Sequence, residues 1–284
     1  MKKLLIFILF LSVSLLVAYQ WPNEAGEIAF SFGSFRQGVV SKEITIAYDS
    51  AISIRPIEMG SLLFVQQANC DIMPVRAGST VIMQNSNHIR SIYSYLDNVT
   101  VTSTLFENLP FATARNRDGY YTFNFALYDN QLNQFVNPLL FLPLMSQLNT
   151  APVIHNISLL DPFGNLIPIT SGLTLPSGHY ELLAYATQAS LLGPHNHRIL
   201  PYNFTVEFMG NIITRLELSA FITASAGRAL LHSSDIGSHN MYASNGMLRL
   251  ASLNLTPGQF FITVRVANIF GVEIEQTVLI TVVW

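Results

Sequence analysis

The sequence has little charge and almost no cysteine. Only 11% of its 284 residues are charged, with 14 Lys and Arg against 17 Asp and Glu, so the formal net charge is −3. This balance offers no cationic surface for a phosphate backbone, and we expect no nucleic-acid partner. The single cysteine, Cys70, cannot form an internal disulfide. Its place well inside the chain also excludes the lipidated first residue of a lipoprotein.

Long apolar runs are missing beyond the N-terminus, although 50% of the residues are hydrophobic. No stretch of 18 apolar residues there lacks a polar, glycine or proline interruption, which argues against a membrane-spanning helix in that part of the chain. The hydrophobic content excludes an intrinsically disordered chain. The apolar residues form short segments rich in Phe, Tyr, Val, Ile and Thr, a composition typical of β-strands. We therefore expect an all-β fold.

The N-terminus has the pattern of a secretory signal peptide. Lys2 and Lys3 form a short cationic region, and the apolar stretch that follows, residues 4–18, is shorter than the roughly 20 residues of a spanning helix. We expect residues 1–18 to be removed on export, and we expect the mature chain in the periplasm or cell envelope, or outside the cell. Loss of both lysines would leave Lys42 as the last lysine and change the net charge from −3 to −5.

Alternating and interrupted apolar segments predict strands in the first half. Short apolar runs between residues 60 and 97 are separated by polar turns such as Asn85-Ser86-Asn87, which predicts an antiparallel meander. Phe123, Phe125 and Leu127 alternate with other residues, so they form one face of a further strand.

A proline-rich segment suggests where the first domain ends. Pro138 and Pro143 exclude a regular central strand between them. We expect a linker at residues 144–152, between an N-terminal domain of residues 19–143 and a C-terminal region of residues 153–284.

The second half contains two similar segments about 80 residues apart. Leu175–Tyr185 and Leu255–Arg265 each place a Pro/Gly turn before a strand, and Val278–Val283 supplies a closing strand. This arrangement is typical of β-sandwich modules. The pattern does not distinguish one sandwich from two smaller ones.

Several segments of the first half carry the pattern of one family. They are Trp21-Pro22, Phe32–Gly38, Gly78–Ile82, Asn87–Leu96, Gly119–Asp129 and Asn137–Phe141. In this order they resemble the opening, the hairpin, the catalytic strand and the closing segment of the lysostaphin-type, or LytM-type, zinc metallopeptidase domain. The second half resembles the Ig-like region that follows this peptidase in some bacterial envelope proteins. The resemblance implies a β-sheet domain of the duplicated hybrid motif type, followed by an Ig-like β-sandwich region.

The residues at the family's metal positions depart from its pattern. The resemblance assigns the zinc-ligand positions to Ser41, Thr45 and Asn124, and two catalytic histidine positions to Tyr95 and Thr122. A catalytic zinc needs three thiolate, imidazole or carboxylate donors, for which hydroxyls and an amide are poor substitutes. Without zinc no bound water reaches a pKa of about 7, and the hydrolytic nucleophile is missing. We expect a pseudoenzyme that holds no zinc or other cofactor.

Other chemistry-bearing residues do not rebuild an active site. Glu43, His88 and Asp97 are too scattered in the sequence to replace the missing ligands. His195 and His197 imitate the family's His-x-His strand, but prolines flank them and two ligands do not hold a catalytic metal. The chain has no phosphate-binding glycine loop, nucleophile elbow or Cys/His pair that would indicate another enzyme class.

Three functions therefore remain open. The favoured hypothesis is an inactive binding or regulatory module of the cell envelope, with peptidoglycan or a cell-wall hydrolase as partner. The second is an active cell-wall zinc endopeptidase whose ligands the pattern misplaces, and the third is a structural secreted β-protein. In the resembled fold, the five substituted positions converge on one groove floor. That groove, formed by Ser41, Thr45, Tyr95, Thr122 and Asn124, is the candidate binding site.

Overall fold

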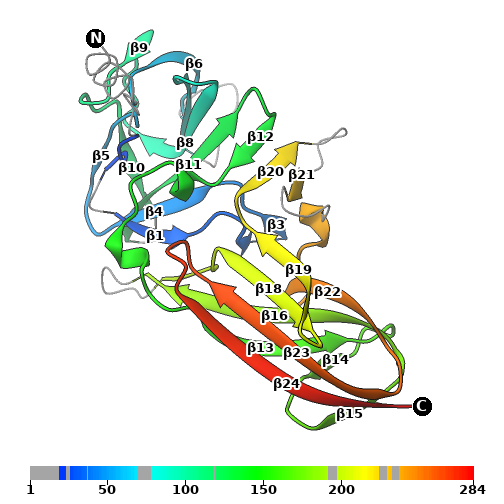
Figure 1. The fold of residues 1–284 in the computed structure, drawn as a ribbon. Helices are drawn as coiled ribbons and strands as arrows, with labels where there is room; N and C mark the ends of the chain where they lie inside the picture. The colour runs from blue at the N-terminus through cyan, green and yellow to red at the C-terminus, as the bar shows by residue number, and fades with distance from the viewer. Residues whose placement is uncertain are drawn as a thin grey trace, which may run out of the picture.

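The chain folds almost entirely into β-strands (Figure 1). The computed structural model describes residues 19–23, 26–36, 38–68, 78–117, 119–190, 197–223, 229–231 and 237–284. In this part of the chain helix occurs only as short 3₁₀ segments, η1 (Pro138–Leu140), η2 (Ser146–Leu148) and η4 (Ser238–Asn240). The all-β prediction is confirmed. The expected signal peptide, residues 1–18, and Cys70 lie outside the described residues.

A large sheet, with twelve strands among the described residues, forms most of the first half of the molecule. Its strands are β1 (Glu27–Phe30), β4 (Ile44–Tyr48), β5 (Ser53–Ile54), β6 (Gly60–Gln66), β7 (Ser79–Gln84), β8 (Ile89–Asp97), β9 (Thr104–Leu105), β10 (Ala112–Arg117), β11 (Tyr120–Asp129), β12 (Gln134–Val136), β20 (Ala220–Thr223) and β21 (Ala229–Leu231). Strands β6, β7 and β8 pair antiparallel in chain order, as the predicted meander requires. A separate hairpin, β2 (Phe35–Arg36) and β3 (Val39–Val40), lies beside the sheet.

Strand β11 is the central strand of this sheet. It pairs antiparallel with β4, β8, β10 and β12. Phe123, Phe125 and Leu127, which the sequence predicts on one face, are fully buried. The rings of Phe125 and Tyr93 lie 5.1 Å apart, centroid to centroid. The position of β11 therefore fixes both the core of this half and the residues that its other face presents.

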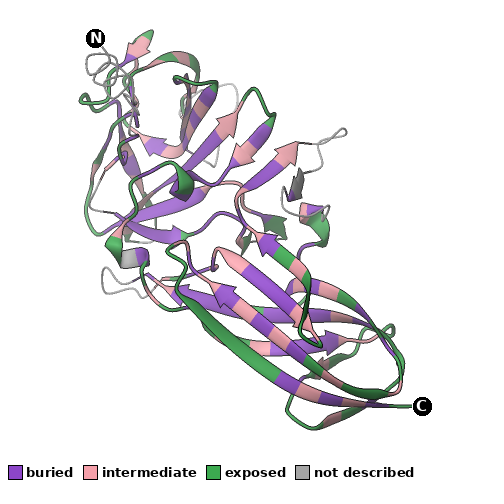
Figure 2. Cartoon of the chain, in the orientation of Figure 1, coloured by how far each residue is buried: buried purple, intermediate pink, exposed green. Residues whose placement is uncertain are grey.

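Two sheets, each of five strands among the described residues, form most of the second half. The first contains β13 (Val153–Leu160), β14 (Leu166–Pro168), β16 (Gly178–Ala189), β17 (Arg198–Ile199) and β22 (Leu248–Leu255), and the second contains β15 (Leu173–Pro176), β18 (Asn203–Phe208), β19 (Asn211–Glu217), β23 (Gly258–Ala267) and β24 (Glu273–Val283). The sheets lie face to face, and buried positions alternate with more exposed ones along β23 and β24 (Figure 2). Leu182, Val264 and Ile280 are fully buried between them.

The two similar segments of the second half occupy equivalent places. Each begins a strand after its turn, at Gly178 for β16 and at Gly258 for β23. Strand β16 pairs with β13, β17 and β22 in one sheet, and β23 lies between β18 and β24 in the other. The predicted closing strand, Val278–Val283, lies within the longer β24.

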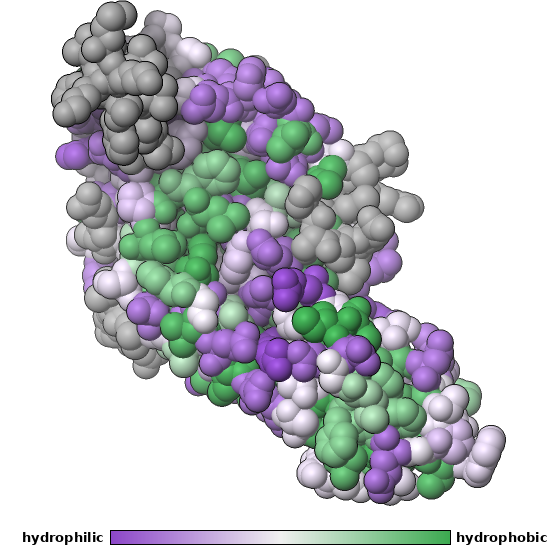
Figure 3. Space-filling model, in the orientation of Figure 1, coloured by the Kyte–Doolittle hydropathy of each residue, from purple (hydrophilic) through white to green (hydrophobic). Residues whose placement is uncertain are grey.

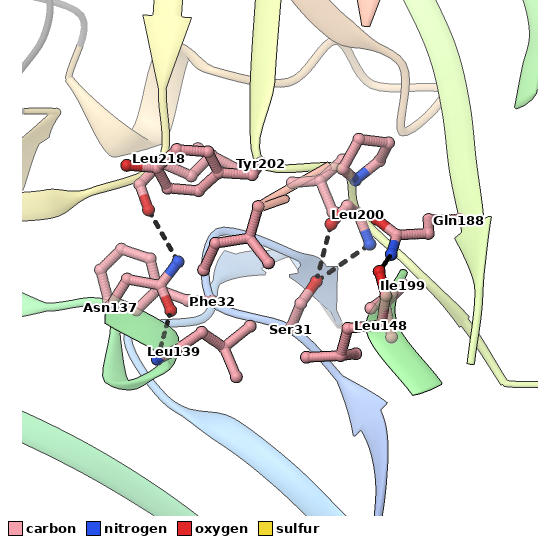
Figure 4. A pocket seen from close by; sticks show the side chains of 12 residues that line it. Ser31, Phe32, Asn137, Leu139, Leu148, Gln188, Ile199, Leu200, Tyr202 and Leu218 are labelled. Atoms are coloured by element: carbon pink, nitrogen blue, oxygen red, sulfur yellow. Dashed lines mark hydrogen bonds between the residues drawn. The ribbon is translucent and has the colours of Figure 1, made fainter. Parts of the chain in front are cut away.

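The two halves share a sheet. Strand β20, from the second half of the sequence, pairs with β12 and so extends the large sheet, with Phe221 opposite Phe135. Near this pairing, Asn137 Nδ2 donates to the Leu218 carbonyl at 2.8 Å, as Figure 4 shows. Hydrogen bonding therefore runs continuously from one half to the other.

Part of the expected linker is packed into this junction. Leu148 is 1% exposed, and the side chains of Gln188 and Asn268 both donate to its carbonyl. Ser31, from the first half, accepts from the Leu200 backbone N–H at 2.9 Å (Figure 4). The domain boundary at residues 144–152 stays a prediction.

The visible surface is mixed in character. On the face in Figure 3, hydrophobic areas lie over both halves, and hydrophilic residues gather near their junction. In the described part of the chain no helix is long and apolar enough to cross a membrane.

The shared sheet leads to a test of stability. Phe221 is fully buried, and its ring lies 5.0 Å from that of Phe32 on the other half. We expect Phe221→Ala to lower the free energy of unfolding by about 3–5 kcal/mol, because it leaves a cavity at the junction. Chemical denaturation measures the change. Phe163→Ala, at a ring that is 89% exposed, is the control and should change it by less than about 0.5 kcal/mol. A loss below about 1 kcal/mol at Phe221 would contradict the shared core.

Candidate functional site

Four of the five residues predicted to form a groove floor line one pocket. Ser41, Thr45, Tyr95 and Asn124 border a cavity of about 260 Å³. Thr122 does not line this cavity. It lies two residues before Asn124 on β11, opposite Ala47, and so about 7 Å further along the strand.

Strand pairing brings these residues together. In the antiparallel pair of β4 and β11, Thr45 lies directly opposite Asn124. The same residue of β11 faces Ser94 of β8, the strand that also carries Tyr95. Because side chains alternate along a strand, Ile44 and Ile46 point into the core, where both are fully buried. The polar residue between them, Thr45, is left for the pocket.

Hydrogen bonds connect the pocket floor. Thr45 Oγ1 donates to Asn124 Oδ1 at 2.8 Å, and Asn124 Nδ2 donates to Glu43 Oε1. Ser41 Oγ donates to the Glu43 backbone carbonyl at 2.8 Å. Both ends of the Asn124 amide are therefore engaged, and Asn124 is itself buried.

The structure places Glu43 in the pocket, although the sequence interpretation sets it aside, with His88 and Asp97, as too scattered to replace the missing zinc ligands. Glu43 lines the cavity together with Ser41 and Thr45. Its place two residues before Thr45 and two after Ser41 is the signal that could have found it, although Ser41 and Glu43 lie just before β4 begins at Ile44. His88 and Asp97 do not line this cavity.

Burial changes the acidity of Glu43. Removal from solvent raises the pKa of its carboxyl from the ordinary 4.5 to about 7, while the hydrogen bond from Asn124 and the charge of Arg36 act in the opposite direction. Desolvation penalises the ionised form, because a carboxylate loses more hydration than a carboxylic acid does. Near neutral pH the pocket floor therefore carries a carboxyl that is only partly ionised.

Two arginines stand at the side of the pocket, each against an aromatic ring. The Arg36 guanidinium lies 4.4 Å from the centroid of the Phe30 ring, and the Arg117 guanidinium lies 5.8 Å from that of Tyr95. All four residues line the cavity. Sequence reasoning missed Phe30 and Arg117 because they come from separate strands, β1 and β10, with no shared motif. Arg36 belongs to the Phe32–Gly38 segment that carries the family resemblance.

The donor set of the pocket does not fit zinc. Ser41, Thr45 and Asn124 offer neutral hydroxyl and amide groups, and the Thr45 hydroxyl and the Asn124 amide are hydrogen-bonded to each other. Glu43 is the one carboxylate among the lining residues. Among the described residues no three His, Cys, Asp or Glu side chains gather closely enough to hold a metal ion. We derive no hydrolytic step from this arrangement.

The second histidine constellation is only partly described. His195 lies outside the described residues, and His197 follows directly after that gap. The His197 backbone carbonyl accepts from the Ser190 N–H at 2.8 Å. The interpretation of His195 and His197 as a loop stays a prediction.

Comparisons with known proteins give weak similarities. One protein-family model matches residues 151–283, and it names no activity. No curated protein matches the chain.

Three solved structures match the chain weakly. The SpoIIQ–SpoIIIAH pore-forming complex matches at 15% identity and a TM-score of 0.36, covering 44% of this chain and 90% of that one. Lysostaphin matches at 12% identity and a TM-score of 0.36, covering 78% and 95%. The fibronectin(III)-like modules of Clostridium thermocellum CbhA match at 9% identity and a TM-score of 0.24, covering 91% and 90%. Because all three TM-scores lie below 0.5, we base no functional conclusion on them.

The raised pKa of Glu43 predicts how stability varies with pH. The folded state holds the Glu43 proton more tightly than the unfolded chain does, so this group's contribution is complete below pH 4.5 and is lost as the pH rises through about 7. Glu43→Gln has no ionisable carboxyl at this position, so its stability does not fall with pH for this reason. Between pH 4.5 and 8 we expect the variant to gain up to about 3 kcal/mol of unfolding free energy relative to the wild type.

Denaturation curves of both proteins across this pH range measure the difference. Glu107→Gln, at an exposed glutamate, is the matched control and should give a difference that changes by less than about 0.5 kcal/mol. A constant difference between the wild type and Glu43→Gln would show that the Glu43 carboxyl is hydrated in solution.

Proposed function

We propose that the protein is an exported, catalytically inactive peptidase-like module of the cell envelope that binds a partner through the pocket of Ser41, Thr45, Tyr95 and Asn124. Peptidoglycan is the partner that the family resemblance favours, and a cell-wall hydrolase is the alternative. One observation carries the proposal. The positions that the resemblance assigns to zinc ligands hold neutral groups. In two of them, the Thr45 hydroxyl donates a hydrogen bond to Asn124 Oδ1 at 2.8 Å.

The pocket retains the means to bind without a metal. Tyr95 is half-buried at its wall, and hydroxyl and carboxyl groups line its floor. Groups of this kind donate and accept hydrogen bonds to the backbone of a peptide or to a glycan. A structural β-protein would need these polar groups only to satisfy one another. Binding by the pocket distinguishes the two functions.

The zinc content of the purified protein distinguishes the proposed inactive module from an active zinc endopeptidase. We expect purified mature protein, after dialysis, to contain well below one zinc per chain and to cleave no cross-bridge peptide, because the pocket lacks three suitable donors. Elemental analysis and a peptide-cleavage assay measure both properties. About one zinc per chain, removed by a chelator together with hydrolytic activity, would overturn the inactive assignment.

A substitution at the wall tests the pocket itself. Asn124→Ala would remove the hydrogen bonds that Asn124 makes with the Thr45 hydroxyl and the Glu43 carboxyl. We expect this loss to lower the free energy of unfolding by about 1–3 kcal/mol. Tyr95→Ala is the sharper variant, because it removes a ring from the wall and leaves the floor intact. We expect it to weaken co-sedimentation with purified peptidoglycan roughly 5- to 30-fold, the usual effect of losing an aromatic contact.

Tyr185→Ala is the matched control, since Tyr185 is 45% exposed on β16 in the other half. It should bind as the wild type does. Loss of binding in Tyr185→Ala and not in Tyr95→Ala would place the interaction on the C-terminal sheets. If the wild type does not sediment with peptidoglycan, this partner is wrong.

A further inference from the structure

A cluster of polar side chains lies on the outer face of the C-terminal sheets, on strands β16 and β22. His179 lies directly opposite Asn254 in this antiparallel pair, and Ser252 lies two residues before Asn254 on the same face. This face points outward, because Tyr180 and Leu253, which alternate with these residues, are buried. Strand register therefore brings His179 to two residues that lie 73 and 75 positions further along the chain.

Two hydrogen bonds connect the three polar side chains in a line. His179 Nδ1 lies 2.8 Å from Asn254 Oδ1, and His179 Nε2 lies 3.2 Å from Ser252 Oγ. The Asn254 oxygen can only accept a hydrogen bond, so Nδ1 carries the proton of the neutral imidazole and Nε2 presents a lone pair. The Ser252 hydroxyl therefore donates to His179 Nε2.

These contacts are the ones that activate a serine hydroxyl. A hydroxyl is a weak nucleophile until an adjacent base takes its proton, and the base acts best when a third group holds its orientation. An amide oxygen can be that third group, as in Cys-His-Asn sites. Ser252, His179 and Asn254 are all exposed, so a substrate and water can reach them.

A cavity of about 460 Å³ adjoins the serine. Ser252 lines it together with Glu181, Asn240 and Arg249. Glu181 is the next outward residue of β16 after His179, and its carboxylate forms an ion pair with Arg249. Because the two charges are paired and the remaining lining is largely polar, the cavity suits a small neutral and polar ligand.

We propose that Ser252, His179 and Asn254 form a hydrolytic centre for small neutral esters. Ser252 is the nucleophile, His179 is the general base and Asn254 is a positioning residue. The centre lies on the C-terminal sheets and uses no residue of the pocket around Asn124. It is therefore independent of the proposed function, and neither depends on the other.

The reaction balances with water as the second reactant. The Ser252 proton passes to His179 Nε2 as Ser252 Oγ attacks the ester carbonyl carbon and forms a C–O bond. The imidazolium returns this proton to the alcohol oxygen as the ester C–O bond breaks, which leaves the acyl group on Ser252. Water then gives a proton to Nε2 and attacks the acyl carbon, and release of the carboxylic acid restores the serine. The sum is hydrolysis of one ester to an alcohol and an acid.

Hydrolysis of 4-nitrophenyl acetate tests the activity. We expect the purified mature protein to exceed the buffer rate, and Ser252→Ala and His179→Gln each to lower the protein-dependent rate about tenfold or more. His155→Gln is the matched control, because His155 Nε2 also lies beside a hydroxyl, that of Thr187 at 2.7 Å, but Thr187 is buried. This control should keep the wild-type rate.

Covalent labelling identifies the nucleophile. A fluorophosphonate reacts with activated serines, and trypsin releases Ser252 in the peptide of residues 250–265, which contains no other serine. Mass spectrometry should find the label on this peptide in the wild type and not in His179→Gln. The melting temperature of each variant should match that of the wild type, since these side chains are exposed.

The pH profile tests the role of Asn254. Asn254→Asp keeps an acceptor for Nδ1 and adds a charge that favours the imidazolium, so the midpoint of the rate against pH should move upward. Asn254→Leu removes the acceptor and should lower the rate. An unchanged midpoint and rate in these variants would overturn the role of Asn254.

Three results would overturn the centre as a whole. They are hydrolysis at the buffer rate, an unlabelled 250–265 peptide, and a rate that survives Ser252→Ala, which would show that an imidazole acts alone. The proposed function is read separately, because co-sedimentation with peptidoglycan should be the same for Ser252→Ala and the wild type.

Discussion

The central constraint on this molecule is the register between β4 and β11. It places the Asn124 amide where it accepts from Thr45 and donates to Glu43. A slip of one residue would exchange the two faces of the strand, bring Asn124 into the core and move both Phe123 and Phe125 out of it. The same register therefore fixes the aromatic core on one side of the sheet and the polar floor of the pocket on the other. The pocket could not be lost or moved without disturbing the packing of the N-terminal half.

Local patterning explains which parts of the fold could be predicted from sequence. Alternating apolar residues and turn residues predict the strands from residue 60 to 97, the central β11 and the strands that begin at Gly178 and Gly258. The pairing of β12 with β20 has no such signal, because it joins residues more than 80 positions apart. Alternation within a strand says which face is buried but not which strand lies beside it. For this reason the sequence does not predict that the two halves share a sheet.

The same distinction applies to the candidate site. Ser41, Thr45, Tyr95 and Asn124 border one cavity. The sequence groups them only through the family resemblance, because a single strand pattern carries no long-range information. Thr122 lies on the same face of β11 as Asn124, but two residues earlier along the strand, outside the cavity. The sequence interpretation excludes Glu43 because Glu43, His88 and Asp97 are too scattered in the sequence to rebuild a zinc site. The actual neighbours of Glu43, an amide and an arginine, give it a different chemistry.

The acidity of Glu43 bears on whether the pocket is a site or only a filled cleft. A cleft converted to structural core would gain stability from groups whose hydrogen bonds are complete and whose charges are absent. Glu43 instead lowers the stability of the folded state as the pH rises toward neutrality, since its pKa lies near 7. A glutamine could make the same bond with Asn124 without this cost. A half-buried carboxyl with a raised pKa, close to the charge of Arg36, is therefore not what a filled structural cleft requires, because binding sites tolerate local instability that cores do not.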